Sequence, residues 1–327
     1  MKIERKISME QKAAVRSLRE RVGISVEADN LKTLVDTIVE TEQAGVEQIW
    51  VGGPPWKLET LTALAAAATR TTHLQLGTSV LQVFSRHPVL MAQQALSFDA
   101  LAPGRLRLGI GTSIQEVGKS IYGVEMERPL AYLREYIQVL RPLLQSGEVH
   151  HQGRSFTTDV SLSASSQIPI LISALGPVAF RLAGEIADGA IPAYCPIPYL
   201  LNTALPAMRE GAAAAKRSRP PIIAHVQIAF TEDRATALQI ARQRLAFAAT
   251  ISVYRNMFIG AGFSPQELDT ASDRFVESLI VFGDDSKIRE RLLELLGTEL
   301  DELVVGISPI SDATQETIRL AKIIGQL

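Results

Sequence analysis

Residues 22–53 read VGISVEADNLKTLVDTIVETEQAGVEQIWVGG and decide the fold class. The first seven residues are mostly apolar, which predicts a strand, and Asp29 or Asn30 follows as the cap of a helix. The apolar positions of that helix lie three and four residues apart, at Leu31, Leu34, Val35, Ile38 and Val39. Gly45 ends the helix, and the apolar run after it predicts a second strand.

The same strand-then-helix unit recurs along the chain. Apolar runs predict strands at 22–28, 46–53, 73–80, 105–111, 168–174, 189–193, 222–230 and 302–307. After the first helix, amphipathic stretches predict helices at 58–70, 88–101, 127–145, 177–187, 198–217, 232–249 and 312–325. Parallel strands need such crossover helices, so eight units predict a closed (β/α)8 barrel, the α/β fold called a TIM barrel. An open dinucleotide-binding sheet is disfavoured because no GxGxxG follows the first strand.

The pattern predicts a single domain over 22–327, preceded by a charged extension over 1–21 that we expect to be helical from Met9 to Glu20. Two insertions interrupt the repeating unit. Residues 147–166 are polar and lack helical periodicity, so they predict an excursion after the fourth helix. Residues 250–280 predict an extra, loosely helical segment before the last strand.

Composition excludes several classes of function. The 33 Lys and Arg nearly balance the 35 Asp and Glu, whereas nucleic-acid binding needs a basic excess or stripe. The single cysteine, Cys195, excludes an intrachain disulfide, and no residues show metal-ligand spacing, so we expect no metal. The two uncharged stretches, 160–180 and 189–208, contain prolines, and the amino terminus has no apolar signal segment. We therefore expect a cytoplasmic protein without membrane contact.

Candidate site residues follow from the barrel, whose working groups lie at the carboxyl ends of the strands and in the following loops. This rule selects Ser25, Glu27, Gly52, Gly53, Trp56, Ser79, Val80, Arg86, His87, 111–116, 173–177, Ala193, Tyr194 and Phe230.

The most informative stretch is ISALGPVAFRLAGEIADGAIP (172–192), in which a strand ends in small residues and Gly176-Pro177 opens a helix. Backbone N–H groups at such a helix start make a ready phosphate site. The same residues also suit a tight turn that binds nothing. His87, just before another helix opened by a proline, is likewise either a cap or a site residue.

Three stretches in order carry a resemblance to a known family: Arg86-His87-Pro88, GRLRLGIG (104–111) and GPVAFRLAGEIADG (176–189). They resemble the bacterial luciferase-like monooxygenases and the coenzyme F420-dependent oxidoreductases that share their barrel. Further matches are TEQAGVEQIW (41–50) and VFGDDSKIRERL (281–292). Within this superfamily, 173–191 and ERPLAYLREYI (127–137) are most similar to methylenetetrahydromethanopterin reductase. The resemblance covers about 22–325.

The resemblance implies a flavin or deazaflavin in the carboxyl-terminal mouth of the barrel, with coenzyme F420 favoured over flavin mononucleotide (FMN). The phosphate anchor of the family maps onto Ala174, Leu175, Gly176 and Pro177. A cis peptide is implied near Ser79–Val80, where its bulge would brace the central ring. The other residues expected to contact the cofactor are Ser25, Gly52, Gly111, Thr112, Ala193 and Tyr194.

The sequence departs from these reductases where their proton donors usually stand. Gly52 follows the second strand in place of an acid or histidine, and 112–114 replace a carboxylate after the fourth. Glu27 and Glu116 are the carboxylates still available, so we predict that they are catalytic. The residues expected to wall the substrate pocket are Trp56, His87 and Tyr122.

These features predict an oxidoreductase that transfers a hydride between coenzyme F420 and a small organic substrate. An FMN-dependent monooxygenase is the alternative enzyme. A non-catalytic flavin- or deazaflavin-binding protein is the alternative from another class. The resemblance also implies a homodimer.

Overall fold

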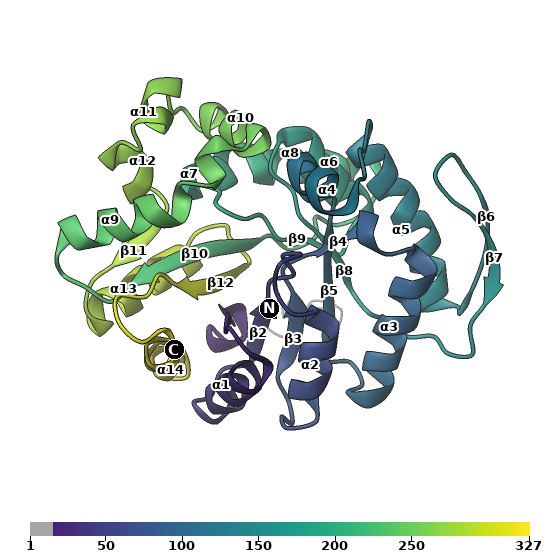
Figure 1. Cartoon of the computed structure of the whole chain (residues 1–327), viewed down its shortest axis with the longest axis horizontal. Helices are drawn as coiled ribbons and strands as arrows, with labels where there is room; N and C mark the ends of the chain where they lie inside the picture. Colours follow the sequence, from purple (N-terminus) through teal and green to yellow (C-terminus); the bar gives the residue numbers. More distant parts are fainter. Residues whose placement is uncertain (1–15) are drawn as a thin grey trace, which may run out of the picture.

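The computed structural model describes residues 16–327 of the chain, and its main sheet has ten strands, eight of which close into a parallel barrel (Figure 1). The barrel strands are β1 (Val22–Ser25), β2 (Gln48–Val51), β3 (Gln75–Thr78), β5 (Leu106–Gly111), β8 (Ile170–Ile172), β9 (Gly189–Ala190), β10 (Ile223–Ala229) and β12 (Glu302–Ile307). They are adjacent in the order β10-β12-β1-β2-β3-β5-β8-β9, and a bridge between Ala190 and Ile222 joins β9 to the start of β10. The predicted TIM barrel is confirmed.

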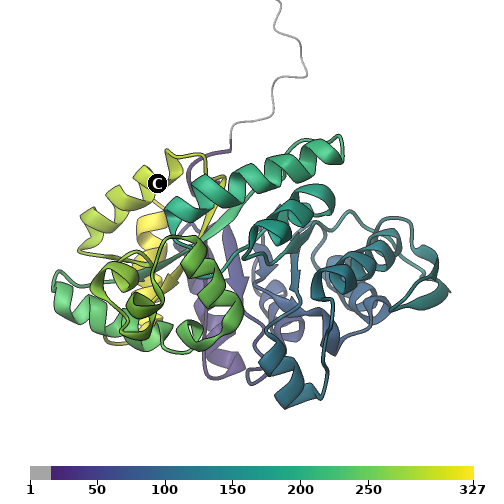
Figure 2. The ribbon, with the colours of Figure 1, turned by 90° about the horizontal axis from the view of Figure 1, so that it is seen from above.

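The helices alternate with these strands and surround them. They are α1 (Leu31–Gln43), α2 (Thr60–Ala68), α3 (Pro88–Leu101), α4 (Gln115–Tyr122), α5 (Pro129–Gln145), α6 (Pro177–Ile186), α7 (Ile197–Tyr199), α8 (Leu205–Ala214), α9 (Arg234–Leu245), α10 (Ser252–Gly260), α11 (Pro265–Asp269), α12 (Asp273–Glu277), α13 (Asp285–Leu296) and α14 (Ala313–Ile324). Figure 2 shows the blue and teal helices on one side of the molecule and the green and yellow ones mainly on the other. Of the two caps considered for α1, Asn30 is the one used: its side chain accepts from the N–H of Thr33 at 2.9 Å.

Three regions of the chain differ from the sequence-based expectation. The polar segment 147–166 contains an antiparallel hairpin of β6 (Glu148–Gln152) and β7 (Thr157–Ser161). The helical segment 250–280 contains α10, α11 and α12, but it is followed by a strand that we did not expect, β11 (Ile280–Phe282), and by α13. Helix α4, just after β5, was also not predicted.

Side chains fill the amino-terminal part of the barrel interior. Trp50 on β2 is fully buried, and a Cβ at Gly77 on β3 would overlap its ring, so the glycine makes room for the indole. The Arg107 guanidinium on β5 lies 4.8 Å from the centre of that ring. Arg107 also donates to Glu302 on β12 at 2.6 Å. The interior is therefore a packed core at this depth.

The end of the amino-terminal extension lies against the same end of the barrel. Arg16 donates to Glu302 at 2.6 Å, and Arg21 donates to the carbonyl oxygens of Leu296, Leu300 and Asp301. The helix predicted over 9–20 falls mostly outside the described residues, and only a short 3-10 turn, Arg19–Arg21, is present at its end. Within 16–327, none of the helices has both the length and the apolar character needed to cross a lipid bilayer.

The opposite, carboxyl-terminal end of the barrel opens between β9 and β10. The two strands meet only at the Ala190–Ile222 bridge. Farther along, residues 227–229 of β10 pair with β11 instead. This change of partner leaves space beside 191–194, the segment that follows β9.

Candidate active site

A cavity of about 830 Å³ occupies the carboxyl-terminal end of the barrel. Its walls include the ends of β1, β2, β3, β8 and β10, the loops after them, the segments after β5 and β9, the start of α6, and parts of α9 and α10. This volume lies within the range of small-molecule and cofactor sites.

The cavity exists because the inward-facing residues near the strand ends are small. Above the Trp50 layer the lining residues include Ser25, Gly52, Ser79, Ser173 and Ala193, each at or just after the end of a different strand. Side chains alternate along a strand, so a residue two positions after an inward-facing residue also faces inward. Gly52 and Ser173 stand in this relation to the inward-facing Trp50 and Leu171. Small side chains at one level of a parallel barrel leave a hollow that larger residues would fill.

A bulge after β3 directs Val80 into this hollow. The Thr78 hydroxyl donates to the carbonyl oxygen of Gly109 at 2.7 Å and accepts from its N–H at 2.8 Å, in place of the regular ladder bonds. The chain then leaves the barrel wall through a cis peptide between Ser79 and Val80, as the resemblance implied, and returns as β4 (Leu81–Gln82) beside β5. Both Ser79 and Val80 line the cavity.

The amino terminus of α6 opens onto the same cavity. Its N-cap residue, Gly176, contributes no side-chain hydrogen bond, and a Cβ added there would meet no atom within 4 Å. Val178 and Ala179, in the first turn, also line the cavity. The Tyr199 hydroxyl donates to the Leu175 carbonyl at 3.0 Å and so fixes the turn before the helix. Unobstructed backbone N–H groups at a helix start favour an anion such as a phosphate.

Two polar residues on β10, His225 and Gln227, face the cavity and are not among the residues selected from the sequence. The Nε2 atom of His225 is shielded from solvent and has no hydrogen-bond partner. Burial, helped by the positive charge of Arg244, lowers the pKa of His225 to about 4, so the ring is neutral at pH 7. The sequence does contain a signal for them: two polar residues two positions apart in an otherwise apolar strand face the same side of the sheet, and here that side is the barrel interior.

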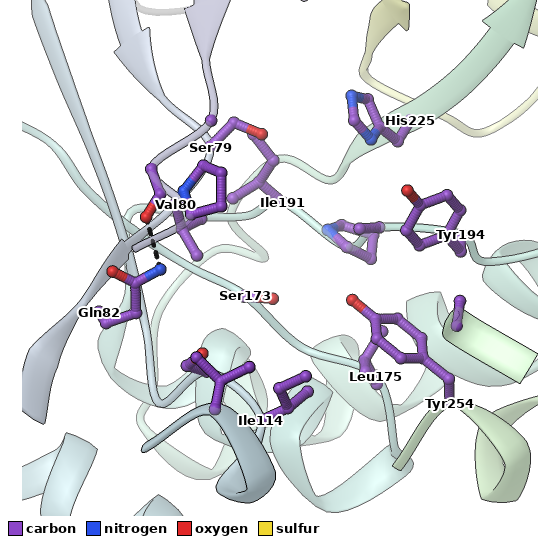
Figure 3. A pocket seen from close by; sticks show the side chains of 18 of the residues that line it. Ser79, Val80, Gln82, Ile114, Ser173, Leu175, Ile191, Tyr194, His225 and Tyr254 are labelled. Carbon is purple, nitrogen blue, oxygen red and sulfur yellow. Dashed lines mark hydrogen bonds between the residues drawn. The ribbon is translucent and has the colours of Figure 1, made fainter. Parts of the chain in front are cut away.

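Two tyrosines face the cavity next to His225. Tyr194 follows β9 with a positive φ of 56°, and Tyr254 lies on α10 with its ring edge-on to that of Tyr194 at 5.7 Å. Burial raises the pKa of both hydroxyls, so they stay protonated and can donate hydrogen bonds. Figure 3 shows Tyr194, His225 and Tyr254 on one side of the pocket and Val80, Gln82 and Ile114 on the other.

Charged side chains lie toward the rim. Glu27, after β1, accepts from Arg244 of α9 at 3.1 Å, and the Glu27 side chain is 62% exposed. Lys57, after β2, donates to Asp29 at 3.1 Å. These pairs lower the net charge that the rim presents to a ligand.

The structure gathers most of the predicted site residues around this cavity. Those that line it are Ser25, Glu27, Gly52, Trp56, Ser79, Val80, Thr112, Leu175, Gly176, Pro177, Ala193 and Tyr194. Of the residues given a role, the five that do not line it are Gly111, Ala174, His87, Glu116 and Tyr122; the remaining candidates Arg86, Gln115 and Phe230 also lie outside it.

Local packing explains why these five residues lie apart from the cavity. His87 is the N-cap of α3 and accepts from the N–H of Val89 at 3.3 Å. Tyr122 packs edge-on against Phe84 at 5.2 Å, and Glu116 is exposed in the first turn of α4. Gly111 lies under the Val80 side chain, and Ala174 is buried behind the strand end.

Comparison with known proteins reveals clear similarity to one family. The profile of the family described as "Luciferase-like monooxygenase" matches residues 13–302. An F420-dependent glucose-6-phosphate dehydrogenase from Nakamurella multipartita is 32% identical over 247 residues, which are 70% of this chain and 73% of that enzyme. A 5,10-methylenetetrahydromethanopterin reductase from Methanopyrus kandleri is 25% identical over 91% of this chain and 95% of the reductase.

Similarity to solved structures supports the same fold. An F420-dependent secondary alcohol dehydrogenase, solved in complex with an F420–acetone adduct, aligns with a TM-score of 0.78. The alignment covers 94% of this chain and 97% of the other, at 18% sequence identity.

Proposed function

This chain belongs to the luciferase-like monooxygenase family, as its sequence motifs predict, and we propose that it is an oxidoreductase that uses coenzyme F420. The relatives named above support the cofactor, because the dehydrogenase carries F420 in its name and the reductase represents the same branch that the sequence resembles. The proposed reaction is hydride transfer between the deazaflavin and a small organic substrate. When bound, the cofactor supplies the hydride donor or acceptor.

One structural observation carries the proposal: the open start of α6 and the Val80 bulge face a single cavity. Gly176, Val178 and Ala179 would hold a phosphate of the cofactor through backbone N–H groups. Val80 would brace its ring on the wall opposite Tyr194 and His225. The small residues at the strand ends leave room for a planar ring system, so the residues present suit such a group.

The chain itself would position the substrate and supply its proton. Tyr194 and Tyr254 are held protonated by burial and present hydroxyl donors to the space that faces Val80. Either hydroxyl can bind a substrate oxygen, and neutral His225 beside them can hold that hydroxyl in orientation. Glu27, the carboxylate predicted to be catalytic, lies at the rim of the same cavity, where it accepts from Arg244.

A pair of fluorescence titrations tests the proposal. Oxidised coenzyme F420 and, separately, FMN are added to the purified protein, and quenching of each ligand's fluorescence is followed. We expect F420 to saturate at about one molecule per chain and FMN to bind weakly or not at all. Saturation with FMN alone would favour the monooxygenase. F420 binding without turnover on any carbonyl or alcohol substrate would favour a non-catalytic binding protein.

Two matched variants locate the binding site. Gly176→Trp places an indole at the start of α6, where an added Cβ meets no atom within 4 Å, and the ring is expected to block the anion site. Leu101→Trp puts the same side chain on an exposed position at the end of α3, outside the cavity. We expect only Gly176→Trp to weaken F420 binding. The homodimer stays a prediction, which the molar mass from light scattering would check.

A further inference from the structure

Exposed apolar side chains gather at the mouth of the cavity. Among the described residues that line it, five large apolar side chains are 44% to 67% exposed: Trp56, Leu58, Val178, Phe247 and Val253. They come from three separate parts of the chain, namely the loop after β2, the first turn of α6, and the segment from α9 to α10. Exposed apolar groups that converge from distant segments mark a binding surface for an apolar molecule.

The charged groups of the cavity are already neutralised. Among its lining residues in the described part of the chain, the charged side chains are Glu27, Lys57 and Arg244. Arg244 is paired with Glu27, and Lys57 is paired with Asp29. A phosphate dianion near Arg244 would face the Glu27 carboxylate at the same time, and this repulsion would offset most of its attraction. Each lining cation in 16–327 therefore already has a carboxylate partner, although the exposed Lys57–Asp29 pair is weak and the partner of Arg244 is the one that opposes a phosphorylated substrate.

The polar groups inside the cavity suit a neutral oxygen atom. Tyr194 and Tyr254 are protonated hydroxyls, and His225 is neutral at pH 7. The Nε atom of Arg244 is shielded from solvent and has no partner, so it offers one N–H while the charge of the side chain stays balanced by Glu27. One carbonyl or hydroxyl oxygen of a ligand can accept hydrogen bonds from these donors, while the rest of the ligand contacts the apolar side chains at the mouth of the cavity.

We infer that the substrate of this site is an uncharged, largely apolar ketone or alcohol rather than a sugar phosphate. This inference rests on the proposed function and adds the class of substrate to it. It separates the chain from relatives named glucose-6-phosphate dehydrogenases, whose substrate carries a phosphate dianion. The start of α6 is not available for a second phosphate, because the cofactor phosphate is assigned there.

Calorimetric titration tests the inference without relying on turnover. The protein is saturated with oxidised coenzyme F420 and titrated with acetophenone, 2-octanone and glucose 6-phosphate, at low and high salt and at two temperatures. We expect at least one ketone to bind, with a negative heat-capacity change and little dependence on salt, because apolar area is buried and no charge is paired. Binding of glucose 6-phosphate with strong salt dependence, or binding of neither ketone, overturns the inference.

Three variants test which residues of the cavity bind the ketone and which disfavour a phosphate. Trp56→Ala removes the largest side chain of the mouth and should weaken ketone binding about tenfold. Leu101→Ala, on the exposed face of α3 outside the cavity, is the matched control and should leave it unchanged. Glu27→Gln frees the charge of Arg244, so inorganic phosphate should bind this variant and not the parent protein. Equal ketone affinity in Trp56→Ala and the control would overturn the assignment.

Failure of the inference can be told apart from failure of the proposed function. If coenzyme F420 does not bind, the proposed function fails, and the ketones are then titrated into cofactor-free protein to test the apolar mouth alone. If coenzyme F420 binds and, of the three ligands, only glucose 6-phosphate binds to the cofactor-saturated protein, the proposed function stands and the inferred substrate class is wrong.

Discussion

The contact between Thr78 and Gly109 makes the bulge after β3 sensitive to a single methyl group. A Cβ added at Gly109 would overlap the Thr78 carbonyl oxygen, well inside the 3.0 Å that real Cβ atoms essentially never go below. It would also lie 3.2 Å from Cγ1 of Val80. Gly109→Ala must therefore move the Thr78 backbone, on which the two hydrogen bonds to Gly109 and the position of Val80 depend.

The expected cost can be worked from these contacts. Overpacking a dense core costs about 1–3 kcal/mol. Each of the two buried hydrogen bonds between Thr78 and Gly109, if lost, adds about 1–3 kcal/mol. If both hydrogen bonds are lost, we therefore expect Gly109→Ala to lower the free energy of unfolding by about 3–9 kcal/mol, a large part of the roughly 5–15 kcal/mol of a typical domain. Because Val80 is displaced, coenzyme F420 should also bind more weakly.

Gly176→Ala is the matched control, since it makes the same substitution where the added Cβ meets no atom within 4 Å. Its free energy of unfolding should stay within about 1 kcal/mol of the parent protein. Both variants are compared by urea unfolding and by titration with coenzyme F420. A Gly109→Ala variant as stable as Gly176→Ala, with unchanged cofactor affinity, would refute the argument that this contact positions Val80.

Two further predictions concern ionisable groups inside the barrel. Glu302 is 2% exposed and pairs with Arg107, which is 12% exposed, so Glu302→Ala should cost about 3–5 kcal/mol by leaving that arginine unpaired. In the same urea assay Glu277→Ala, which removes a surface partner of Arg234, should cost less than about 1 kcal/mol, and equal costs would contradict the prediction. The lowered pKa of His225 means that its contribution to stability is full above about pH 6.5 and is lost as the pH falls toward 4, because the unfolded chain binds the proton first. Between pH 7 and 5, His225→Gln should therefore lose less stability than the parent protein, and an equal loss in thermal unfolding would contradict the lowered pKa.

The barrel could be predicted because most of its strands are buried on both faces and therefore appear as continuous apolar runs. Most of the long helices were equally visible, and the predicted span 88–101 matches α3 at both ends, whereas α4 and α13 were not predicted. Strand β11 was missed because it has only three residues, two of them partly exposed, and too short a run shows no period.

The candidate site was predictable only in part. The small residues at the strand ends could be found, because the apolar runs locate the strands and the functional groups of such a barrel lie where the strands end. His225, Gln227, Tyr254 and Arg244 were not found, since their place at the cavity depends on which face of β10, α9 and α10 turns inward. His87 illustrates the opposite error, because a histidine before a helix satisfies the helix start as readily as it serves a site.

A crystal structure of the protein with oxidised coenzyme F420 tests the central claim most directly. We predict that the cofactor phosphate contacts the backbone N–H groups at the start of α6 and that its ring lies against Val80, facing Tyr194 and His225 across the cavity. A cofactor bound away from this cavity, or a ring that leaves Val80 uncovered, would contradict the proposed function.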